Sequence, residues 1–400
     1  MDLMKYLAVL GRLPKISLAE LEANFSGVRE ILAGKLAVFT PRVEGELPEI
    51  RRFGGSLKFA KKLEETPLEF LKKLPEGKIT LGVSDYSRGA SARKALAEAL
   101  KLKKILARLG RSVRVIPNKE AVLSTAVSHH NQVAEKKNHV EIIKFGKEYY
   151  VVIGVQNISE YAKRDQARPA RDAKVGMLPP KLAQILLNLN GELSAGARVL
   201  DPFCGTGVVL QEALLNGYRV LGTDLSEKMV DYTKRNLDWL VSEKGFLGSI
   251  ERNLTKEEKF DIIERYSEAS CLVGDAREVD WRGSLNGRKI DAVAAEVFLG
   301  SPMSKPPVEI KLREEKENCQ AIILGFLKNL SGQISAGTPV TLAIPAWLRE
   351  TGEYSRLKIL DEIEKLGYNL VKFKSASQRD LIYYREGQVV AREIISLRKK

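Results

Sequence analysis

The chain has little of what builds disulfide frameworks, zinc sites or membrane spans. Its 400 residues include three cysteines and three histidines, and the thiols lie far apart, at Cys204, Cys271 and Cys319. An odd and sparse set of thiols argues against disulfides and for a reducing compartment, so we expect a cytoplasmic protein. The three histidines lack metal-ligand spacing, so we expect no metal. No apolar run approaches 18 residues, so we expect no membrane span.

The positive charge is confined to one half of the chain. Residues 1–190 hold 34 Lys and Arg against 20 Asp and Glu, a net charge of +14, whereas residues 191–400 hold 31 of each. A basic half joined to a neutral half is expected when one half binds a polyanion and the other does chemistry on it. The charge therefore predicts a nucleic-acid partner.

The most informative stretch runs from residue 197 to 224 and reads ARVLDPFCGTGVVLQEALLNGYRVLGTD. It predicts a strand, a Gly-rich turn, a helix and a second strand, with Asp201 and Asp224 at the C-terminal ends of the two strands. Ligands of doubly wound sheets bind at those ends, and glycines let the backbone approach a ligand closely. A carboxylate such as Asp224 can accept two bonds from a ribose diol.

This stretch has three other interpretations. A dinucleotide fingerprint needs a third glycine, which is absent, and a phosphate-binding loop needs Lys after its last glycine, where Val208 stands. A turn with a purely structural role stays possible. A third predicted strand also ends in an acid, Asp275, in register with Asp201 and Asp224, although a capping role for Asp275 stays open.

Four segments resemble one family. The block DPFCGTG resembles the first motif of S-adenosylmethionine-dependent methyltransferases. The segments GRLPKISLAELEANF, LSTAVSHHN and RPARDAKVGMLPPKLAQILLN are similar to archaeal-type tRNA guanine-N2 methyltransferases that carry a THUMP domain and methylate guanosine 10. The resemblance implies an α/β protein with a C-terminal Rossmann-like class I methyltransferase domain, whose seven-stranded sheet ends in an antiparallel hairpin. It also implies α+β ferredoxin-like and THUMP domains before it.

The expected domain boundaries follow from that resemblance and from composition. We expect a ferredoxin-like domain at 1–75, a THUMP RNA-binding domain at 76–158, a linker at 159–180 and the methyltransferase domain at 181–400. The implied cofactor is S-adenosylmethionine, the implied partner is tRNA, and we expect a monomer. The implied cofactor-binding residues are Asp201, Phe203, Cys204, Gly205, Thr206, Gly207, Asp224, Leu225, Asp275 and Ala276. The backbone of Ala276 and the carboxylate of Asp275 would face the adenine.

Basic side chains upstream are candidates for RNA binding. One face of the helix expected at 91–108 is lysine-rich, and arginines follow it, which favours a phosphate-tracking surface over simple solvation. For His129 and His130, packing or capping is an equal alternative. The full set of RNA-binding candidates is Lys103, Lys104, Arg111, Arg114, His129, His130, Asn131, Arg164, Arg168, Arg171 and Lys174.

The chain departs from the family at its fourth motif. Amino-methylating enzymes place Asp or Asn there, then Pro-Pro and an aromatic residue, whereas this chain reads Glu296-Val297-Phe298. We expect Glu296 and Phe298 to be catalytic, with Glu296 accepting from a base amino group and Phe298 stacking on a flipped base. Loss of proline removes a rigid turn. Two alternatives therefore stay open, a catalytically degenerate THUMP RNA-binding protein and an amino-methyltransferase acting on another RNA base.

Overall fold

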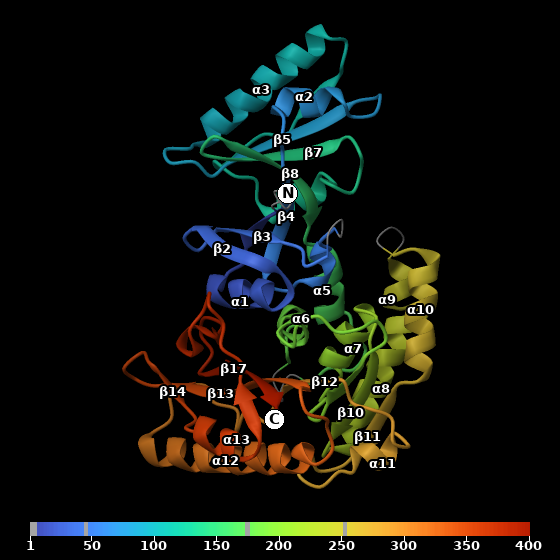
Figure 1. Cartoon of the computed structure of the whole chain (residues 1–400), viewed down its shortest axis with the longest axis vertical. Helices are drawn as coiled ribbons and strands as arrows, with labels where there is room; N and C mark the ends of the chain where they lie inside the picture. Colours follow the sequence, from blue (N-terminus) through green and yellow to red (C-terminus); the bar gives the residue numbers. More distant parts are fainter. Residues whose placement is uncertain (1–5, 44–46, 173–176, 251–253) are drawn as a thin grey trace. The chain divides into compact units, whose positions relative to one another are not determined.

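The computed structural model describes residues 6–43, 47–172, 177–250 and 254–400. They divide into two compact units, Met1–Ser159 and Glu160–Lys400 (Figure 1). The division coincides with the expected start of the linker.

The N-terminal unit is built on one mixed sheet with strand order β2-β3-β1-β4-β8-β7-β5-β6 among the described residues. β5 is buried along its whole length, because β6 and β7 flank it and α3 packs across it. The elements are β1 (Tyr6–Leu10), α1 (Pro14–Asn24), β2 (Ser26–Leu32), β3 (Leu36–Thr40), η1 (Ile50–Arg52), β4 (Ser56–Lys62), α2 (Pro67–Lys72), β5 (Ile79–Asp85), α3 (Ala92–Arg108), β6 (Val113–Val115), α4 (Thr125–His130), β7 (His139–Phe145) and β8 (Glu148–Val155).

This sheet crosses the domain boundary expected at residue 75. β4, from the expected ferredoxin-like segment, pairs with β8, from the expected THUMP segment. A buried ion pair between Lys58 of β4 and Glu141 of β7 also joins the two segments. The described residues therefore show no division between compact units at 75/76. The ferredoxin-like and THUMP assignments stay predictions.

The segment expected as a linker is partly structured and belongs to the C-terminal unit from Glu160 onward. It begins with α5 (Ile158–Gln166), in which Tyr161 and Arg164 are buried. Arg164 forms an ion pair with Glu212 of the C-terminal unit, with Nε and Oε1 2.5 Å apart. This part of the segment is therefore anchored to the C-terminal unit.

The C-terminal unit has a doubly wound sheet. Seven strands of the described residues follow the order β11-β10-β9-β12-β13-β17-β15, with β14 and β16 as short additions to β13 and β17. The neighbours from β11 to β13 are parallel, and β17 is antiparallel to both β13 and β15. The expected hairpin is the pairing of β16 with β17.

The elements of this unit are α6 (Pro180–Asn188), β9 (Arg198–Asp201), α7 (Val208–Leu215), β10 (Arg219–Asp224), α8 (Glu227–Val241), α9 (Phe246–Ser249), α10 (Lys256–Ser267), β11 (Ser270–Val273), α11 (Trp281–Ser284), β12 (Ala292–Glu296), α12 (Glu309–Ser331), β13 (Pro339–Leu348), β14 (Tyr354–Arg356), α13 (Leu360–Lys365), β15 (Tyr368–Leu370), η2 (Gln378–Asp380), β16 (Ile382–Tyr383) and β17 (Val390–Lys399).

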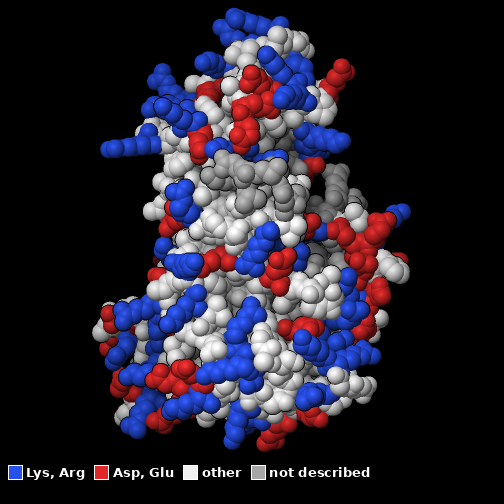
Figure 2. All heavy atoms as spheres, in the orientation of Figure 1, with Lys and Arg blue, Asp and Glu red and all other residues white. Residues whose placement is uncertain are grey.

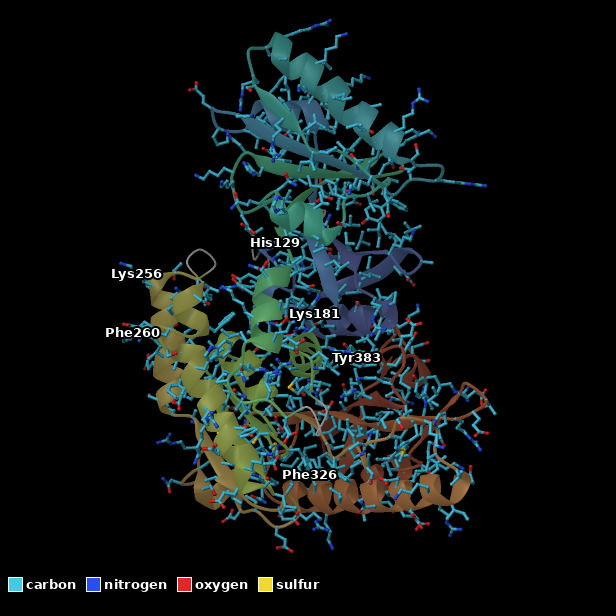
Figure 3. All side chains as sticks on the ribbon, turned by 180° about the vertical axis from the view of Figure 1, so that it is seen from behind. His129, Lys181, Lys256, Phe260, Phe326 and Tyr383 are labelled. Carbon is cyan, nitrogen blue, oxygen red and sulfur yellow. The ribbon has the colours of Figure 1, made fainter. Side chains whose placement is uncertain are left out.

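Helices cover both faces of this sheet (Figure 1). α6, α7 and α8 contact the strands on one side, while α12 buries an apolar stripe that includes Ile323 and Phe326 against Leu200, Val293 and Leu342. Phe326, labelled in Figure 3, packs edge-on against Phe203 in the turn after β9, with ring centroids 5.2 Å apart. The core thus extends directly under the Gly-rich turn.

Candidate active site

The Gly-rich turn leaves β9 and enters α7 in a conformation that needs glycine. Gly205 and Gly207 have φ angles of 51° and 80°, which other residues adopt at a cost. A Cβ on Gly207 would lie 3.0 Å from Thr233 Cγ2 of α8. The turn is held by Cys204, whose backbone N–H donates to Thr223 O at 2.8 Å. The turn therefore keeps its backbone close to the C-terminal ends of β9 and β10.

The acids at these strand ends are held by backbone amides. Asp224 accepts from Gly205 N and Ser226 N, each at 2.9 Å, so its carboxylate is oriented toward the turn. Asp201 is 2% exposed and accepts from Phe203 N at 3.1 Å. Burial raises the pKa of Asp201 well above its usual range, and the nearby Asp224 and Glu296 carboxylates raise it further. Asp201 is therefore a buried acid on the cavity side of β9, and two further carboxylates lie near it.

A cavity of about 760 Å³ opens at these strand ends in the C-terminal unit, within the size range of small-molecule sites. Its walls include every expected cofactor-binding residue except Gly207, and both expected catalytic residues, Glu296 and Phe298. Residues that the sequence analysis did not single out also line it, notably Asp172, Lys228 and Asn318. The tertiary structure thus brings the ends of four strands to one cavity.

Asp275 forms an ion pair with Arg277. Its carboxylate receives the Arg277 guanidinium, with Nε 2.9 Å from Oδ1 and 3.0 Å from Oδ2, and this bond holds the pKa of Asp275 below its usual range. An adenine amino group would have to share the remaining lone pairs of this carboxylate. The expected role of Asp275 stays a prediction, and Arg277 also lines the cavity.

Glu296 and Phe298 lie where β12 leaves the sheet. Glu296 Oε1 accepts from Arg392 Nε of β17 at 2.7 Å, and Glu296 lines the cavity with a side chain 14% exposed. Phe298 lies on the cavity wall and is 41% exposed, as a stacking platform requires. Their expected catalytic roles stay predictions.

The turn after Phe298 is held by Glu315 of α12 instead of by Pro-Pro. Gly300 adopts a φ of 86°, and a Cβ there would lie 2.6 Å from Glu315 Oε2 of α12. The same oxygen accepts from Ser301 N at 3.0 Å. A buried carboxylate and a glycine therefore fix this exit, which was expected to lose its rigid turn with the prolines.

Two expected RNA-binding arginines are buried inside the C-terminal unit, and for them that prediction is wrong. Arg164 is 5% exposed and pairs with Glu212, while Arg168 is 3% exposed and donates to Thr206 Oγ1 at 3.2 Å. Neither guanidinium can reach a phosphate backbone. Arg171 is exposed, and Lys174 lies outside the described residues.

The remaining candidates lie on the N-terminal unit. Lys103 and Lys104 are exposed on α3, whose basic side chains appear as blue spheres at the top of Figure 2. Arg111 instead donates to the Leu74 and Pro75 carbonyls.

The group around α4 is mostly occupied by internal bonds. Arg114 Nη2 donates to Asn131 Oδ1 at 2.7 Å, and His129 Nε2 lies 3.1 Å from Ser159 Oγ. Figure 3 labels His129 on α4, and its neighbour His130 is exposed. The contact with Ser159 fits the packing role left open for His129, whereas His130 keeps an accessible ring, and RNA binding by either histidine stays a prediction.

Two functional contacts had no signal in the sequence. Asn236 of α8 is fully buried. Its side-chain amide donates to Ala170 O, in the segment before α6, and to Thr206 O, in the Gly-rich turn, each at 2.9 Å. It therefore links these two segments. Arg392, 96 residues beyond Glu296, forms its ion pair. These contacts join residues that are distant in the sequence, so the pattern of neighbouring residues does not predict them.

The strand order, the antiparallel β17 and the Gly-rich turn after the first strand define a Rossmann-like methyltransferase domain, the fold expected for this part of the chain. Residues 168–263 match the family model UPF0020, described as "RMKL-like, methyltransferase domain". The chain is also 43% identical over 128 residues to a tRNA (guanine(10)-N2)-dimethyltransferase of Methanothermobacter thermautotrophicus, covering 30% of this chain and 38% of that protein. The resemblance expected from the sequence is confirmed over this region.

A second relative with the same name, from Methanocaldococcus jannaschii, is 29% identical over 147 residues, which is 36% of this chain and 35% of that protein. The matched regions thus span little more than a third of these relatives' length. The crystal structure of TrmN from Thermus thermophilus is 20% identical and covers 99% of this chain and 100% of its own, with a TM-score of 0.44.

Neither a membrane span nor a metal site is found among the described residues. No helix there is both long and apolar enough to cross a bilayer. Across the same ranges, no group of three or more His, Cys, Asp or Glu side chains could hold a metal ion.

Proposed function

We propose that this protein transfers a methyl group from S-adenosylmethionine to the exocyclic N2 amino group of a guanosine in tRNA, at position 10. The observation that carries the proposal is the cavity, whose walls include Glu296 and Phe298 together with the acids Asp201, Asp224 and Asp275. The names of the two archaeal relatives support the same base and position.

The cavity residues fit this cofactor. Asp224 keeps lone pairs for a ribose diol after its two backbone bonds, and Leu225 offers an exposed apolar surface beside it. Arg168 does not itself line the cavity, but it contacts Met177 Sδ and Thr206, which do, and it brings a buried positive charge close to that wall.

The cofactor, when bound, supplies an activated methyl group and takes the bonding electrons onto its sulfur. The protein must make a poor nucleophile effective, because the lone pair of an exocyclic amino nitrogen is delocalised into the ring. Glu296 would accept an amino hydrogen and take up the proton that the nitrogen loses as its new bond to carbon forms. Phe298 would stack on the base once it leaves its helix.

The N-terminal unit would bind the tRNA by backbone and shape. It carries 28 Lys and Arg against 17 Asp and Glu in residues 1–159, and the exposed lysines of α3 form part of that excess. We infer a cytoplasmic monomer, for which light scattering after gel filtration tests the oligomeric state.

The test is incubation of the protein with labelled S-adenosylmethionine and an unmodified tRNA transcript, followed by nucleoside mass spectrometry. We expect label in N2-methylated guanosine, and its loss when guanosine 10 of the transcript is replaced by adenosine. E296A should lower the rate by about 10²–10⁴-fold, the contribution typical of a positioned acid or base. Full activity of E296A would refute the role of Glu296, and label in no nucleoside would refute the proposal.

One observation favours a second candidate, an RNA-binding protein without turnover. Glu296 forms an ion pair with Arg392, and a carboxylate that has lost its catalytic role would keep such a structural contact. In that case the protein binds the transcript and S-adenosylmethionine while no nucleoside acquires label. Methylation of another base's amino group would point instead to a different RNA target.

A further inference from the structure

The ion pair at the end of β12 joins two parts of the sheet that are distant in sequence. Arg392 Nε lies 2.7 Å from Glu296 Oε1, and Arg392 Nη1 donates to Gln388 Oε1 at 3.2 Å. Arg392 is 5% exposed on β17, where it is paired opposite Pro345 of β13. The guanidinium is therefore held on two sides before any substrate arrives.

Only one oxygen of Glu296 is used by this pair. Oε2 has no hydrogen-bond partner in the described part of the chain, and Glu296 lines the cavity with Phe298. A carboxylate fixed through one oxygen and open at the other is a preorganised acceptor, whereas an unpaired glutamate, one methylene longer than aspartate, would sample several rotamers. The geometry thus leaves an acceptor site at the cavity.

We propose that Arg392 is the positioning residue for Glu296, holding Oε1 so that Oε2 accepts the amino hydrogens of the target guanine; this rests on the proposed function. In this chain, Glu296 with Arg392 does the work that a shorter acidic or amide side chain does beside Pro-Pro. The charge on the guanidinium also strengthens the hydrogen bond that orients the carboxylate.

Methyl transfer at this site balances in atoms and electrons. The amino nitrogen forms a bond to the methyl carbon, the carbon–sulfur bond breaks, and its electron pair stays on sulfur. One N–H proton passes to Oε2 of Glu296 and then to water. Arg392 takes no part in this transfer: it donates hydrogen bonds to Glu296 and Gln388 and acts only through Glu296.

The chain offers a matched control. Arg356 of β14 forms an ion pair of similar length, 2.9 Å, with Glu393, the neighbour of Arg392 on β17. Like Arg392, it is paired through a guanidinium to a carboxylate that is almost buried. Arg356 is not on the wall of the cavity, so R356Q removes a comparable ion pair from the same sheet and leaves Glu296 held.

The test compares R392Q, R392K and R356Q in steady-state methylation of a tRNA transcript. R392Q should lower kcat by about 10–100-fold, because a catalytic group about 1 Å out of place can cost 10²-fold. KM for S-adenosylmethionine should stay within about twofold, R392K should restore part of the rate, and R356Q should keep kcat. In the E296A background, R392Q should add less than about a twofold loss, since coupled residues are not additive.

The outcomes separate the two claims. Wild-type protein that methylates guanosine together with an R392Q variant of unchanged kcat overturns the positioning role alone. An equal loss in R392Q and R356Q, or full additivity of R392Q with E296A, also overturns it, because either result means general destabilisation. If the wild-type protein gives no methylated guanosine, the proposed function fails and this inference fails with it.

Discussion

The buried ion pair in the N-terminal unit makes a sharp prediction about how that unit is held together. Lys58 Nζ of β4 lies 2.7 and 2.9 Å from the two oxygens of Glu141 of β7 and donates to Leu123 O at 2.8 Å. The two side chains are 2% and 0% exposed. We predict that K58M strongly destabilises this unit, because it leaves an unpaired carboxylate in the interior.

The magnitude follows from what K58M leaves behind. Breaking a buried pair from one side costs about 3–5 kcal/mol, and an unsatisfied carbonyl at Leu123 adds about 1–3 kcal/mol. Ser84 and Ser128 still donate to Glu141, each at 2.6 Å, so we expect a loss at the lower end of the combined range of about 4–8 kcal/mol, that is about 4–5 kcal/mol. The double variant K58M/E141L should recover most of this loss, since replacing both partners is often neutral.

The assay is hydrogen exchange of the full chain, followed by mass spectrometry of peptides from β4 and β7. K58M should lower protection in both peptides together, because the sheet joins the segments expected as two domains. The control is K62M, which removes the exposed pair between Lys62 and Glu148 in β4 and β8 and should cost less than about 1 kcal/mol. Equal effects of K58M and K62M, or loss of protection in one segment only, would refute the reasoning.

Two further predictions concern the cavity and the RNA. D201N should raise the free energy of unfolding at pH 7, since burial raises the folded pKa of Asp201 and the ionised carboxylate therefore opposes folding at this pH. Ionisation of Asp201 destabilises the folded protein increasingly as pH rises from the unfolded to the folded pKa of this group. In urea melts, the stability gained by D201N should therefore shrink at acidic pH. A stability difference that does not change with pH would contradict this prediction. The triple variant K101Q/K103Q/K104Q should weaken tRNA binding and flatten its salt dependence by about 0.7–0.9 for each phosphate that is no longer neutralised, with KM for S-adenosylmethionine unchanged. K256Q, on the exposed end of α10 in the other unit (Figure 3), serves as the control in filter binding, and equal slopes for the two variants would argue against α3.

A local pattern competes with tertiary contacts at Ser17 and Glu20 in the N-terminal unit. Ser17 and Glu20 read as the start of a helix, with Ser as cap and Glu three residues later. In the structure, α1 begins at Pro14, and Glu20 is fully buried and accepts from Gly54 N and Gly55 N at 2.9 and 2.8 Å. Ser17 and Glu20 therefore form hydrogen bonds with the distant loop at Gly54 and Gly55 and do not cap the helix. The spacing of residues within the helix cannot predict such contacts.

The count of basic residues was also a limited guide to RNA binding. A run of arginines before a Gly-rich motif predicts contact with a polyanion, and the charge count cannot tell an exposed guanidinium from a buried one. Arg164 and Arg168 are buried because Glu212 and Thr206 of the C-terminal unit are available to them. Whether a cation meets RNA or protein depends on which surface covers it.

The sequence by itself determined the Gly-rich turn, the acids at the strand ends and the order of strand and helix around them, because backbone conformation and hydrophobic period are local properties. It also placed the break in the family pattern at Glu296-Val297-Phe298. Only the tertiary structure decided what stands in for the missing prolines, since Arg392 and Glu315 reach that exit from β17 and α12. Contacts between residues far apart in sequence form only when the sheet assembles, and here they decide how the cavity is built.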